Sequence, residues 1–198
     1  MDDLDKAAVR WVMEGERDCT CIDLGCGFPM QSSRFALMGA RVVCVDIFDF
    51  SETVDSIASA LSIDIRFENV SIEKYFSTSA PVIADVIFSQ RTIHYIEPHI
   101  MHRIAKSMFN SVSSGGHIFV SASGIHSELG NGYKAKTIDW IDRFGFLADG
   151  MQEKHGIVNE VCLYSEEDMV SLFEDSGFET KSIYSSSFGN IKGIFYRK

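Results

Sequence analysis

Two carboxylates and two glycines stand at spacings that suit the binding of a nucleotide. Asp23 precedes Gly25 and Gly27 in "CIDLGCG", where an apolar run leads into a turn, and Asp46 ends the next apolar run, "RVVCVD". Glycines let the backbone turn tightly and approach a ligand without a Cβ in the way. A carboxylate at Asp46 can accept hydrogen bonds from both hydroxyls of a ribose. The spacing therefore predicts a site for a ligand that contains a ribose.

The turn lacks one residue of the dinucleotide fingerprint. The third glycine of that fingerprint would fall at position 30, which is Met30. Asp23, just before the loop, would repel a pyrophosphate but suits a ligand that carries an ammonium group and a sulfonium. S-adenosylmethionine has both groups as well as a ribose. These residues favour S-adenosylmethionine over a nicotinamide or flavin dinucleotide.

The elements that must position these residues alternate along the chain. Strands are predicted at 19–24, 41–47, 63–70, 83–89 and 117–123, and helices at 4–16, 32–38, 52–61, 97–113 and 165–176. This alternation predicts a doubly wound α/β fold whose sheet is mostly parallel, with helices on both faces. Two last strands, at 178–184 and 191–197, are separated only by "SSSFGN". Because a parallel crossover needs about a dozen residues, these two strands are expected to be antiparallel.

One segment is too long to be a simple connection. Residues 124–164 separate a predicted strand from a predicted helix, where such loops usually take about 2–6 residues. The segment contains a predicted amphipathic helix at 136–148. An insertion after the carboxyl end of a parallel strand lies beside the ligand crevice, so we expect it to form a substrate wall or lid. We expect residues 1–198 to fold as one domain, with an N-terminal helix within 1–18.

From about Cys19 to Lys198 the chain resembles the class I S-adenosylmethionine-dependent methyltransferases. The similarity lies in "DLGCG" (23–27), Asp46, "ADVIFSQRTIHYI" (84–96), "GGHIFVSAS" (115–123) and "YSEEDMVSLFEDSGFETKSIY" (164–184). The resemblance implies a seven-stranded sheet of order 3-2-1-4-5-7-6 in which strand 7 is antiparallel. It also implies S-adenosylmethionine as the cofactor and methyl transfer as the reaction.

The resemblance assigns residues to the cofactor. In the family the first loop holds the methionine moiety, the residue after the ribose carboxylate packs on adenine, and the backbone after the fourth strand meets the methionine amino group. The implied cofactor-binding residues are Asp23, Gly25, Cys26, Gly27, Asp46, Ile47, Ser71, Ser89 and Gln90. Two positions depart from the family. Pro29 replaces a common glycine and stiffens the loop, and Ser71, with Asn69 nearby, stands where many relatives carry an adenine-binding Asp.

The acceptor site is less marked in the sequence. A sulfonium is already an activated electrophile, so the protein mainly has to hold the reactants in line, and a general base is needed only for a protonated acceptor. The candidate catalytic residues are His94, His126 and Glu128, and the candidate substrate-binding residues are Arg91, Tyr95 and Tyr133. A base, an orienting role and a purely structural role all stay open for His94. Tyr133 could stack on a flat acceptor or pack the insertion.

Composition limits the partners. The net charge is −10, and the 18 basic residues form no dense cluster, so nucleic acid is not expected. Neither the five cysteines nor the histidines have the spacing of a metal site, so no metal is expected. The acidic start is unlike a secretory signal, and no apolar run approaches about 20 residues. We therefore expect a cytoplasmic protein without a membrane partner, and we make no prediction of its oligomeric state.

The leading hypothesis is a methyltransferase that transfers a methyl group to a small-molecule acceptor. A protein side chain is the alternative acceptor. A non-catalytic S-adenosylmethionine-binding subunit would keep Asp23, Gly25 and Asp46 but would need no acceptor pocket. An oxidoreductase would instead bind NAD. The acceptor atom, whether oxygen, nitrogen, sulfur or carbon, stays open.

Overall fold

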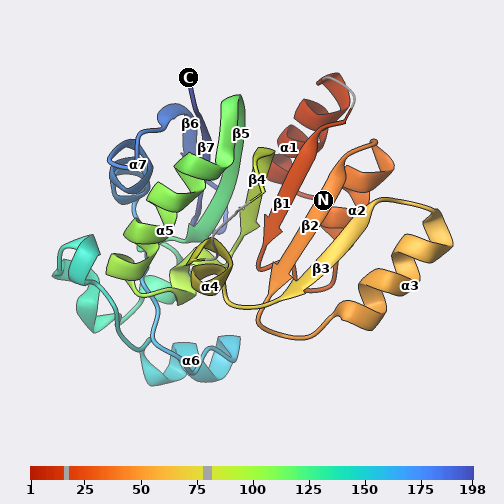
Figure 1. The fold of residues 1–198 in the computed structure, drawn as a ribbon. Helices are drawn as coiled ribbons and strands as arrows, with labels where there is room; N and C mark the ends of the chain where they lie inside the picture. Colours follow the sequence, from red (N-terminus) through yellow and green to blue (C-terminus); the bar gives the residue numbers. More distant parts are fainter. Residues whose placement is uncertain (16–17, 78–81) are drawn as a thin grey trace.

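A seven-stranded sheet forms the centre of the computed structural model, which describes residues 1–15, 18–77 and 82–198 (Figure 1). The strands are β1 (Thr20–Leu24), β2 (Arg41–Asp46), β3 (Ile65–Asn69), β4 (Ala84–Gln90), β5 (Val112–Ser123), β6 (Glu179–Ser185) and β7 (Asn190–Tyr196). Their order is β3-β2-β1-β4-β5-β7-β6. Strands β1 to β5 pair in parallel, whereas β7 runs antiparallel to β5 and β6. The predicted fold class and strand order are confirmed.

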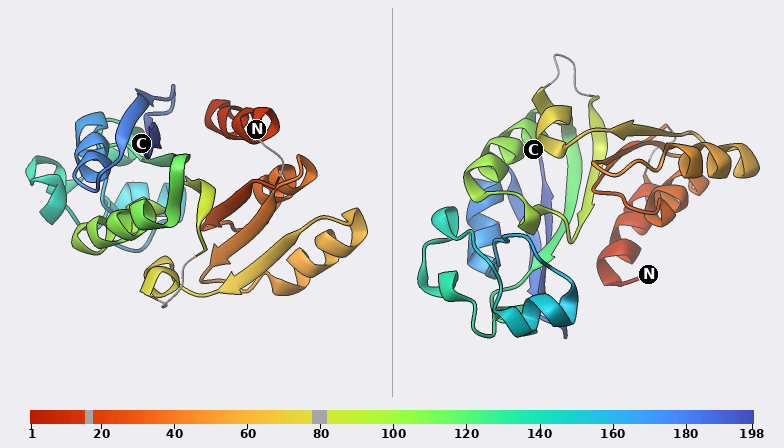
Figure 2. Two further views of the ribbon diagram at one scale, coloured as in Figure 1. Left: turned by 45° about the horizontal axis from the view of Figure 1, so that its top comes forward. Right: turned by 90° about the horizontal axis from the view of Figure 1, so that it is seen from below.

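Helices cover both faces of this sheet (Figure 2). They are α1 (Asp3–Glu14), α2 (Met30–Leu37), α3 (Ser51–Leu61), α4 (Ile72–Ser77), α5 (Pro98–Ser111), α6 (Asp149–His155) and α7 (Glu166–Glu174). Leu4 of α1, Phe35 of α2 and Val54 of α3 belong to one buried cluster. Met101 of α5 and Leu172 of α7 belong to another. The end of the predicted 4–16 helix, at residue 16, and residue 17 lie outside the described residues.

The central strands are apolar because both of their faces are covered. In β1, Cys21 belongs to the cluster under α1 to α3, and Ile22 and Leu24 belong to the cluster under α5 and α7. Alternate side chains of a strand point to opposite faces, so a strand between two helical layers needs apolar residues on both. Asp23 is the charged residue of β1, and it is buried. This residue marks the start of the candidate site.

Local sequence signals set several helix ends. Ser165 caps α7 by accepting a hydrogen bond from the Asp168 backbone N–H, while the Asp168 carboxylate accepts one from the Ser165 N–H. Pro98 stands in the first turn of α5 behind the Glu97 cap. The short helix α4 was not predicted; its start is bonded to Ser71, whose hydroxyl accepts a hydrogen bond from Lys74 N–H. The predicted helices are otherwise confirmed up to the insertion.

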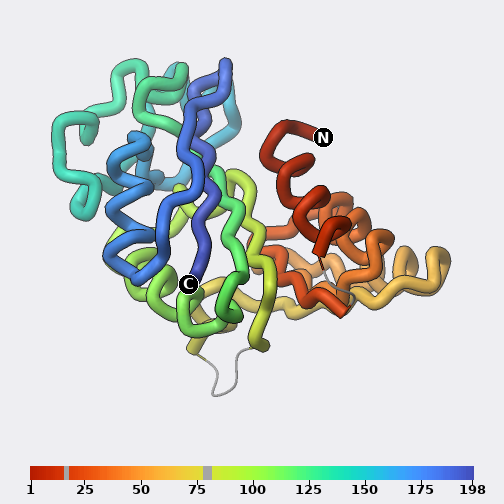
Figure 3. Tube along the Cα trace, turned by 90° about the horizontal axis from the view of Figure 1, so that it is seen from above, coloured from red at the N-terminus to blue at the C-terminus, as the bar shows by residue number. Residues whose placement is uncertain are grey.

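The predicted helix at 136–148 is wrong. The segment instead forms two short 3₁₀ turns, at Lys134–Thr137 and Trp140–Asp142, and the helix that follows, α6, begins only at Asp149. Gly145 pairs with Val161 through backbone hydrogen bonds in both directions, which holds the chain extended there. Figure 3 shows the insertion at the same end of the sheet as the turn between β6 and β7.

Polar contacts fasten the N-terminus of α1 to the sheet. The Lys192 ammonium, buried on β7, forms ion pairs with the carboxylates of Asp2 (2.8 Å) and Asp3. Asp2 also accepts a hydrogen bond of 2.9 Å from the Gln90 side chain at the end of β4. Gln90 and Lys192 are both in register with Ser121 of β5, so they share one row across the sheet. The start of α1 therefore lies against the carboxyl end of β4.

Replacing Lys192 tests this attachment. Lys192→Met keeps the apolar stem but removes the ammonium and both of its ion pairs. We expect the free energy of unfolding to fall by about 1 kcal/mol. The loss should be no larger because water can still reach the carboxylates of Asp2 and Asp3. Urea denaturation measures the change. Lys198→Met is the matched control, since the Lys198 pair with Glu179 is exposed and should contribute nothing measurable. Equal effects of the two variants would show that Lys192 does not fasten α1.

Candidate functional site

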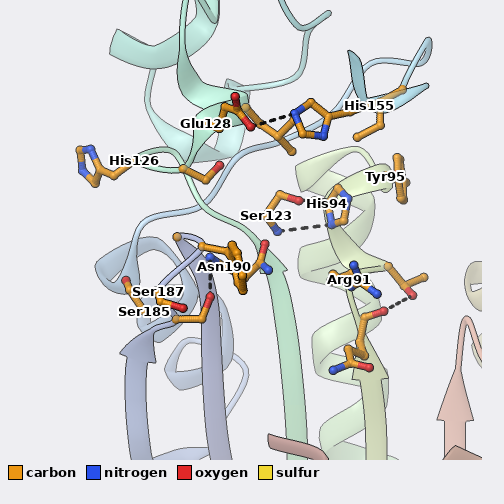
Figure 4. Close-up of a pocket in the computed structure, with 18 of the residues that line it drawn as sticks. Arg91, His94, Tyr95, Ser123, His126, Glu128, His155, Ser185, Ser187 and Asn190 are labelled. Carbon is orange, nitrogen blue, oxygen red and sulfur yellow. Dashed lines mark hydrogen bonds and ion pairs between the residues drawn. The ribbon is translucent and has the colours of Figure 1, made fainter. Parts of the chain in front are cut away.

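A cavity of about 1040 Å³ opens at the carboxyl ends of the parallel strands. Its wall comes from the loop after β1, the turn after β4, the insertion and the turn between β6 and β7 (Figure 4). It brings together seven of the residues singled out in the sequence: Gly25, Gln90, Arg91, His94, Tyr95, His126 and Glu128. The other eight lie outside this lining: Asp23, Cys26, Gly27, Asp46, Ile47, Ser71, Ser89 and Tyr133.

The loop after β1 is held by hydrogen bonds to the end of β2. The backbone N–H groups of Gly25 and Cys26 both donate to Val45 O, at 2.8 and 3.3 Å. The Gly27 N–H donates to the Asp46 carboxylate at 2.9 Å. Gly25 and Gly27 have φ angles of 68° and 52°, in the left-handed region that favours glycine. Contacts within the protein therefore hold the shape of this loop.

Asp23 lies beneath this loop. It is only 3% exposed, and one carboxylate oxygen accepts a hydrogen bond of 2.5 Å from the Ser32 hydroxyl of α2. Burial, together with the nearby charges of Asp46 and Asp5, raises the pKa of Asp23 to about 7. Asp23 is not part of the cavity lining, and its assignment to the cofactor stays a prediction.

The ends of β2 and β3 form a second polar cluster beside the loop. One oxygen of Asp46 accepts from Gly27 N–H and the other from Phe48 N–H. The Asn69 amide donates to the carbonyls of Asp46 and Ile47, at 3.1 and 3.0 Å. Ile47 is 64% exposed although it is apolar. An exposed apolar side chain can pack on an aromatic ring, and a carboxylate held by backbone N–H groups can accept hydrogen bonds from a ribose. Ile47 and Asp46 therefore suit a ligand that has both groups.

Adenine recognition by Ser71 gains no support from its contacts. The Ser71 hydroxyl is exposed and caps α4, and the Asn69 amide is already bonded to two carbonyls. The Asn69 amide nitrogen is therefore occupied at the end of β2. The assignment of Ser71 to the cofactor stays a prediction.

Two neighbouring residues at the end of β4 have different surroundings. Ser89 is buried, and its hydroxyl donates to Leu24 O at 3.1 Å, so it braces β1 from within the sheet. Gln90 lines the cavity. Thr92, which was not predicted, stands against Gly25: its hydroxyl donates to Gln90 O at 3.2 Å, and a Cβ at Gly25 would come within 2.3 Å of it. The turns after β1 and β4 therefore interlock.

His94 is buried at the edge of the cavity. Its Nδ1 accepts from the Ser123 N–H at 3.5 Å, and its Nε2 lies 3.4 Å from the Ser123 hydroxyl. Burial and the nearby Arg91 charge lower the pKa of His94 to about 3. An imidazole of so low a pKa, with Nδ1 already used as an acceptor, is a poor proton acceptor. These contacts favour an orienting role over a general base.

Three other candidate residues lie in the insertion, and they have different surroundings. Glu128 is exposed and forms an ion pair with Lys154, and its carboxylate lies 3.3 Å from His155 Nε2. In Figure 4 the His126 ring points away from Ser123 and His94. Tyr133 is buried in the insertion, where its hydroxyl donates to Val161 O at 2.5 Å. Tyr133 therefore packs the insertion and does not face the cavity.

Sequence reasoning missed the turn between β6 and β7 as part of the wall. Ser185 to Asn190 all line the cavity, and Phe188 among them is 83% exposed. The signal was present. Because β7 pairs antiparallel with β5, the turn before β7 must lie at the carboxyl end of β5. A polar turn longer than a two-residue hairpin at that edge is a candidate for ligand contact.

No protein-family model and no curated protein matches this chain. Solved structures do. An S-adenosylmethionine-dependent methyltransferase from Clostridium acetobutylicum superposes with a TM-score of 0.73 at 13% identity, covering 98% of this chain and 90% of the other. The chain has the class I methyltransferase fold. At such an identity, the property shared with the neighbour is the fold.

Two neighbours with the class I methyltransferase fold were solved with S-adenosylhomocysteine bound. One is 1,6-didemethyltoxoflavin-N1-methyltransferase from Burkholderia thailandensis, with a TM-score of 0.70 at 14% identity over 99% of this chain and 79% of that one. The other is magnesium protoporphyrin IX methyltransferase from Synechocystis PCC 6803, with a TM-score of 0.68 at 15% identity over 98% of this chain and 81% of that one.

The class I methyltransferase fold explains where the cavity lies. The strand order reverses between β1 and β4, and ligands of open α/β sheets bind at such a reversal, outside the carboxyl ends of the strands. Gly25 and Thr92 close this point from its two sides. No helix in the described ranges is long and apolar enough to cross a membrane. Across those same ranges, no three His, Cys, Asp or Glu side chains are grouped to hold a metal ion.

Proposed function

We propose that this protein is an S-adenosylmethionine-dependent methyltransferase that acts on a small molecule. The observation that carries the proposal is the single cavity that joins Gly25, in the loop after β1, to the 124–164 insertion. A cofactor held at the loop would present its reactive end to the same space in which an acceptor would sit. The volume of about 1040 Å³ is slightly above the roughly 300–1,000 Å³ usual for small-ligand sites, which leaves room for part of the cofactor as well as the acceptor.

The residues at the ends of β1 and β2 fit this cofactor. Each Asp46 oxygen accepts one backbone N–H and keeps a second lone pair, so both can accept from ribose hydroxyls. Exposed Ile47 offers an apolar surface for the adenine ring, and Gly25 leaves room for the methionine moiety. When bound, S-adenosylmethionine supplies a methyl group on a sulfonium: a lone pair of the acceptor forms the new bond, and the S–C electron pair stays on sulfur, which gives S-adenosylhomocysteine.

The protein's own part in the reaction is to place the acceptor and exclude water. We propose that the insertion and the turn between β6 and β7 form the wall around the acceptor. His94, neutral and bonded to Ser123, orients this wall without taking a proton. Glu128 is already paired with Lys154. An acceptor atom that carries a lone pair at working pH needs no general base, and the contacts of these residues suit such an acceptor.

Two features of the cavity favour this function over its alternatives. A non-catalytic binding subunit needs no acceptor space, yet the cavity continues past Gly25 into the insertion. A protein acceptor would have to enter a cavity bounded on two sides by the insertion and the β6–β7 turn. A small-molecule acceptor fits that enclosure better.

Two experiments, done one after the other, test the identity of the cofactor and the class of the acceptor. We expect S-adenosylmethionine and S-adenosylhomocysteine to raise the melting temperature, and NAD to leave it unchanged. With methyl-labelled cofactor and a cell extract, label should enter the small-molecule fraction after ultrafiltration. Label confined to protein would support the alternative acceptor, and stabilisation by NAD alone would refute the proposal.

Asp46→Ala is expected to weaken binding of S-adenosylhomocysteine by about 10- to 100-fold, because it removes the proposed ribose acceptors and leaves Gly27 N–H without its partner. Titration calorimetry measures the affinity. Asp49→Ala is the matched control: it removes an equal charge three residues further along the chain, where the Asp49 carboxylate interacts with Ser51 and not with the loop after β1. Unchanged affinity in Asp46→Ala would contradict the ribose assignment.

A further inference from the structure

Arg91 is held in a strained backbone conformation at the mouth of the site. It follows β4 directly and has a φ of 53°, in the left-handed region that a non-glycine residue seldom adopts. Its N–H donates to both the carbonyl (3.0 Å) and the hydroxyl (3.1 Å) of Ser121. Figure 4 shows its side chain among the residues that line the cavity, nearer the strand ends than His94. The backbone is constrained so that this side chain enters the cavity.

The Arg91 guanidinium has no hydrogen-bond or ion-pair partner among the residues that the structure describes. The two buried cations of the described ranges are paired, Arg143 with Asp168 at 2.6 Å and Lys192 with Asp2 at 2.8 Å. Arg91 differs from them because it is exposed and lines the cavity without a partner in those ranges. The sequence holds 28 acidic residues against 18 basic ones, so carboxylates are abundant. The constrained backbone therefore holds an unpaired guanidinium in the wall of this cavity, where it can meet a ligand of negative charge.

Within the described parts of the chain, the cavity wall holds one carboxylate that could compete for Arg91, and that carboxylate is already paired. Glu128 is the only carboxylate in the lining, and Lys154 holds its pKa below the ordinary value while forming an ion pair with it. The side chains of Ser187 and Asn190 line the same cavity and, within the described ranges, have no partner of their own. They add hydrogen-bond donors opposite the turn that carries Arg91.

We propose that the acceptor molecule carries an oxyanion group, a carboxylate or a phosphate, and that the Arg91 guanidinium binds it. The inference rests on the proposed methyltransferase function and adds the chemical class of its substrate. The planar guanidinium matches the two oxygens of a carboxylate or phosphate with two parallel hydrogen bonds. Arg91 is thus a specificity-determining residue, which holds the acceptor by its charge while the cofactor is held at Gly25 and Asp46.

Anion binding to protein saturated with S-adenosylhomocysteine tests this directly. Titration calorimetry with inorganic phosphate and with benzoate should show saturable binding of at least one, and the neutral analogue benzamide should bind at least about 10-fold more weakly. Arg91→Met should lose about 10- to 100-fold in affinity, and Arg91→Lys should fall between. Arg10→Met, which removes an equal charge from the exposed side of α1, should bind the anion as the wild type does.

The outcomes separate the two proposals. Failure to bind S-adenosylhomocysteine would refute the proposed function. Normal binding of S-adenosylhomocysteine with no binding of either anion, or with equal binding of benzamide and benzoate, would overturn the role of Arg91 alone. Phosphate and benzoate together distinguish a phosphorylated acceptor from a carboxylic acid.

A second measurement uses the extract assay. Methyl-accepting activity in the small-molecule fraction should be retained on an anion-exchange resin. With that retained fraction, Arg91→Met should raise KM by about 10- to 100-fold and change kcat far less, because it removes binding and leaves the cofactor site intact. Accepting activity found only in the unretained fraction would overturn the proposal.

Discussion

Gly25→Ala is expected to lower the free energy of unfolding by about 2–5 kcal/mol and to weaken binding of S-adenosylhomocysteine by about 100-fold. A Cβ at this position would lie 2.3 Å from both Cγ2 and Oγ1 of Thr92 and 2.8 Å from its Cβ. Because both branches of the threonine and its Cβ are too close, no rotation about χ1 relieves the clash. The loop would have to move away from β4, and it carries the bonds to Val45 and Asp46 with it. Chemical denaturation and calorimetry measure the two effects.

Gly27→Ala provides the matched control. Gly27 also has a positive φ, but a Cβ there would meet no atom within 4 Å. Only the left-handed backbone is then penalised, by about 1–2 kcal/mol. The double variant Gly25→Ala/Thr92→Gly should recover the difference between the two single variants. Equal losses in Gly25→Ala and Gly27→Ala would show that the contact between Gly25 and Thr92 does not shape the site.

The parts of the fold that sequence reasoning predicted correctly depend on local constraints. The loop after β1 was predictable because an apolar run ends in two glycines at fixed spacing. The reversed strand β7 was predictable because "SSSFGN" is too short for a crossover. Both conclusions need only the geometry of a short stretch of chain, which the residues in that stretch determine.

The helix predicted at 136–148 failed because distant contacts override the local pattern. Ile138, Ile141 and Phe144 recur at helical spacing, but Arg143 is buried and donates to Leu163 O and to the Asp168 carboxylate. A regular helix would not bring this guanidinium to both acceptors while Gly145 pairs with residue 161. Periodicity reports which residues are apolar and carries no information about such partners.

The candidate site divides in the same way. The sequence placed Gly25, Gln90 and Arg91 correctly at the carboxyl ends of β1 and β4, since strand ends follow from the strand pattern. The hydrogen-bond and ion-pair partners of each side chain could not be predicted. The Glu128 carboxylate is paired with Lys154 of α6, a helix that the sequence reasoning did not predict.

Asp23→Asn is expected to stabilise the protein above about pH 7 and to leave it nearly unchanged near pH 4. The pKa of Asp23 rises from 3.8 to about 7 on folding, chiefly through burial. Between these values the folded state binds more protons than the unfolded state, so the free energy of unfolding falls as pH rises. One pKa unit corresponds to about 1.4 kcal/mol, so the Asp23 contribution should fall by up to about 4 kcal/mol across this window. Asparagine does not titrate and should remove that dependence.

Ser32→Ala is the opposite change at the same site. It removes the hydrogen bond that favours the ionised carboxylate and so raises the pKa of Asp23 further. The stability of this variant should therefore keep falling at pH values above about 7, where that of the wild type levels off. Urea denaturation from about pH 4 to pH 8 compares the three proteins. If Asp23→Asn and the wild type differ by the same free energy at every pH, Asp23 does not titrate in this range.

A comparison of the wild type with Asp23→Asn also tests why a buried carboxylate is kept at this position. If the Asp23 charge supports the ammonium of the cofactor through the loop, affinity of the wild type for S-adenosylhomocysteine should rise with pH through about 7, as Asp23 ionises, and that of Asp23→Asn should stay flat. The destabilising charge would then serve cofactor binding, in the way that strained or unfavourable groups persist at functional sites. A pH-independent affinity in both proteins would leave Asp23 as a support for α2 through Ser32, with no part in binding the cofactor.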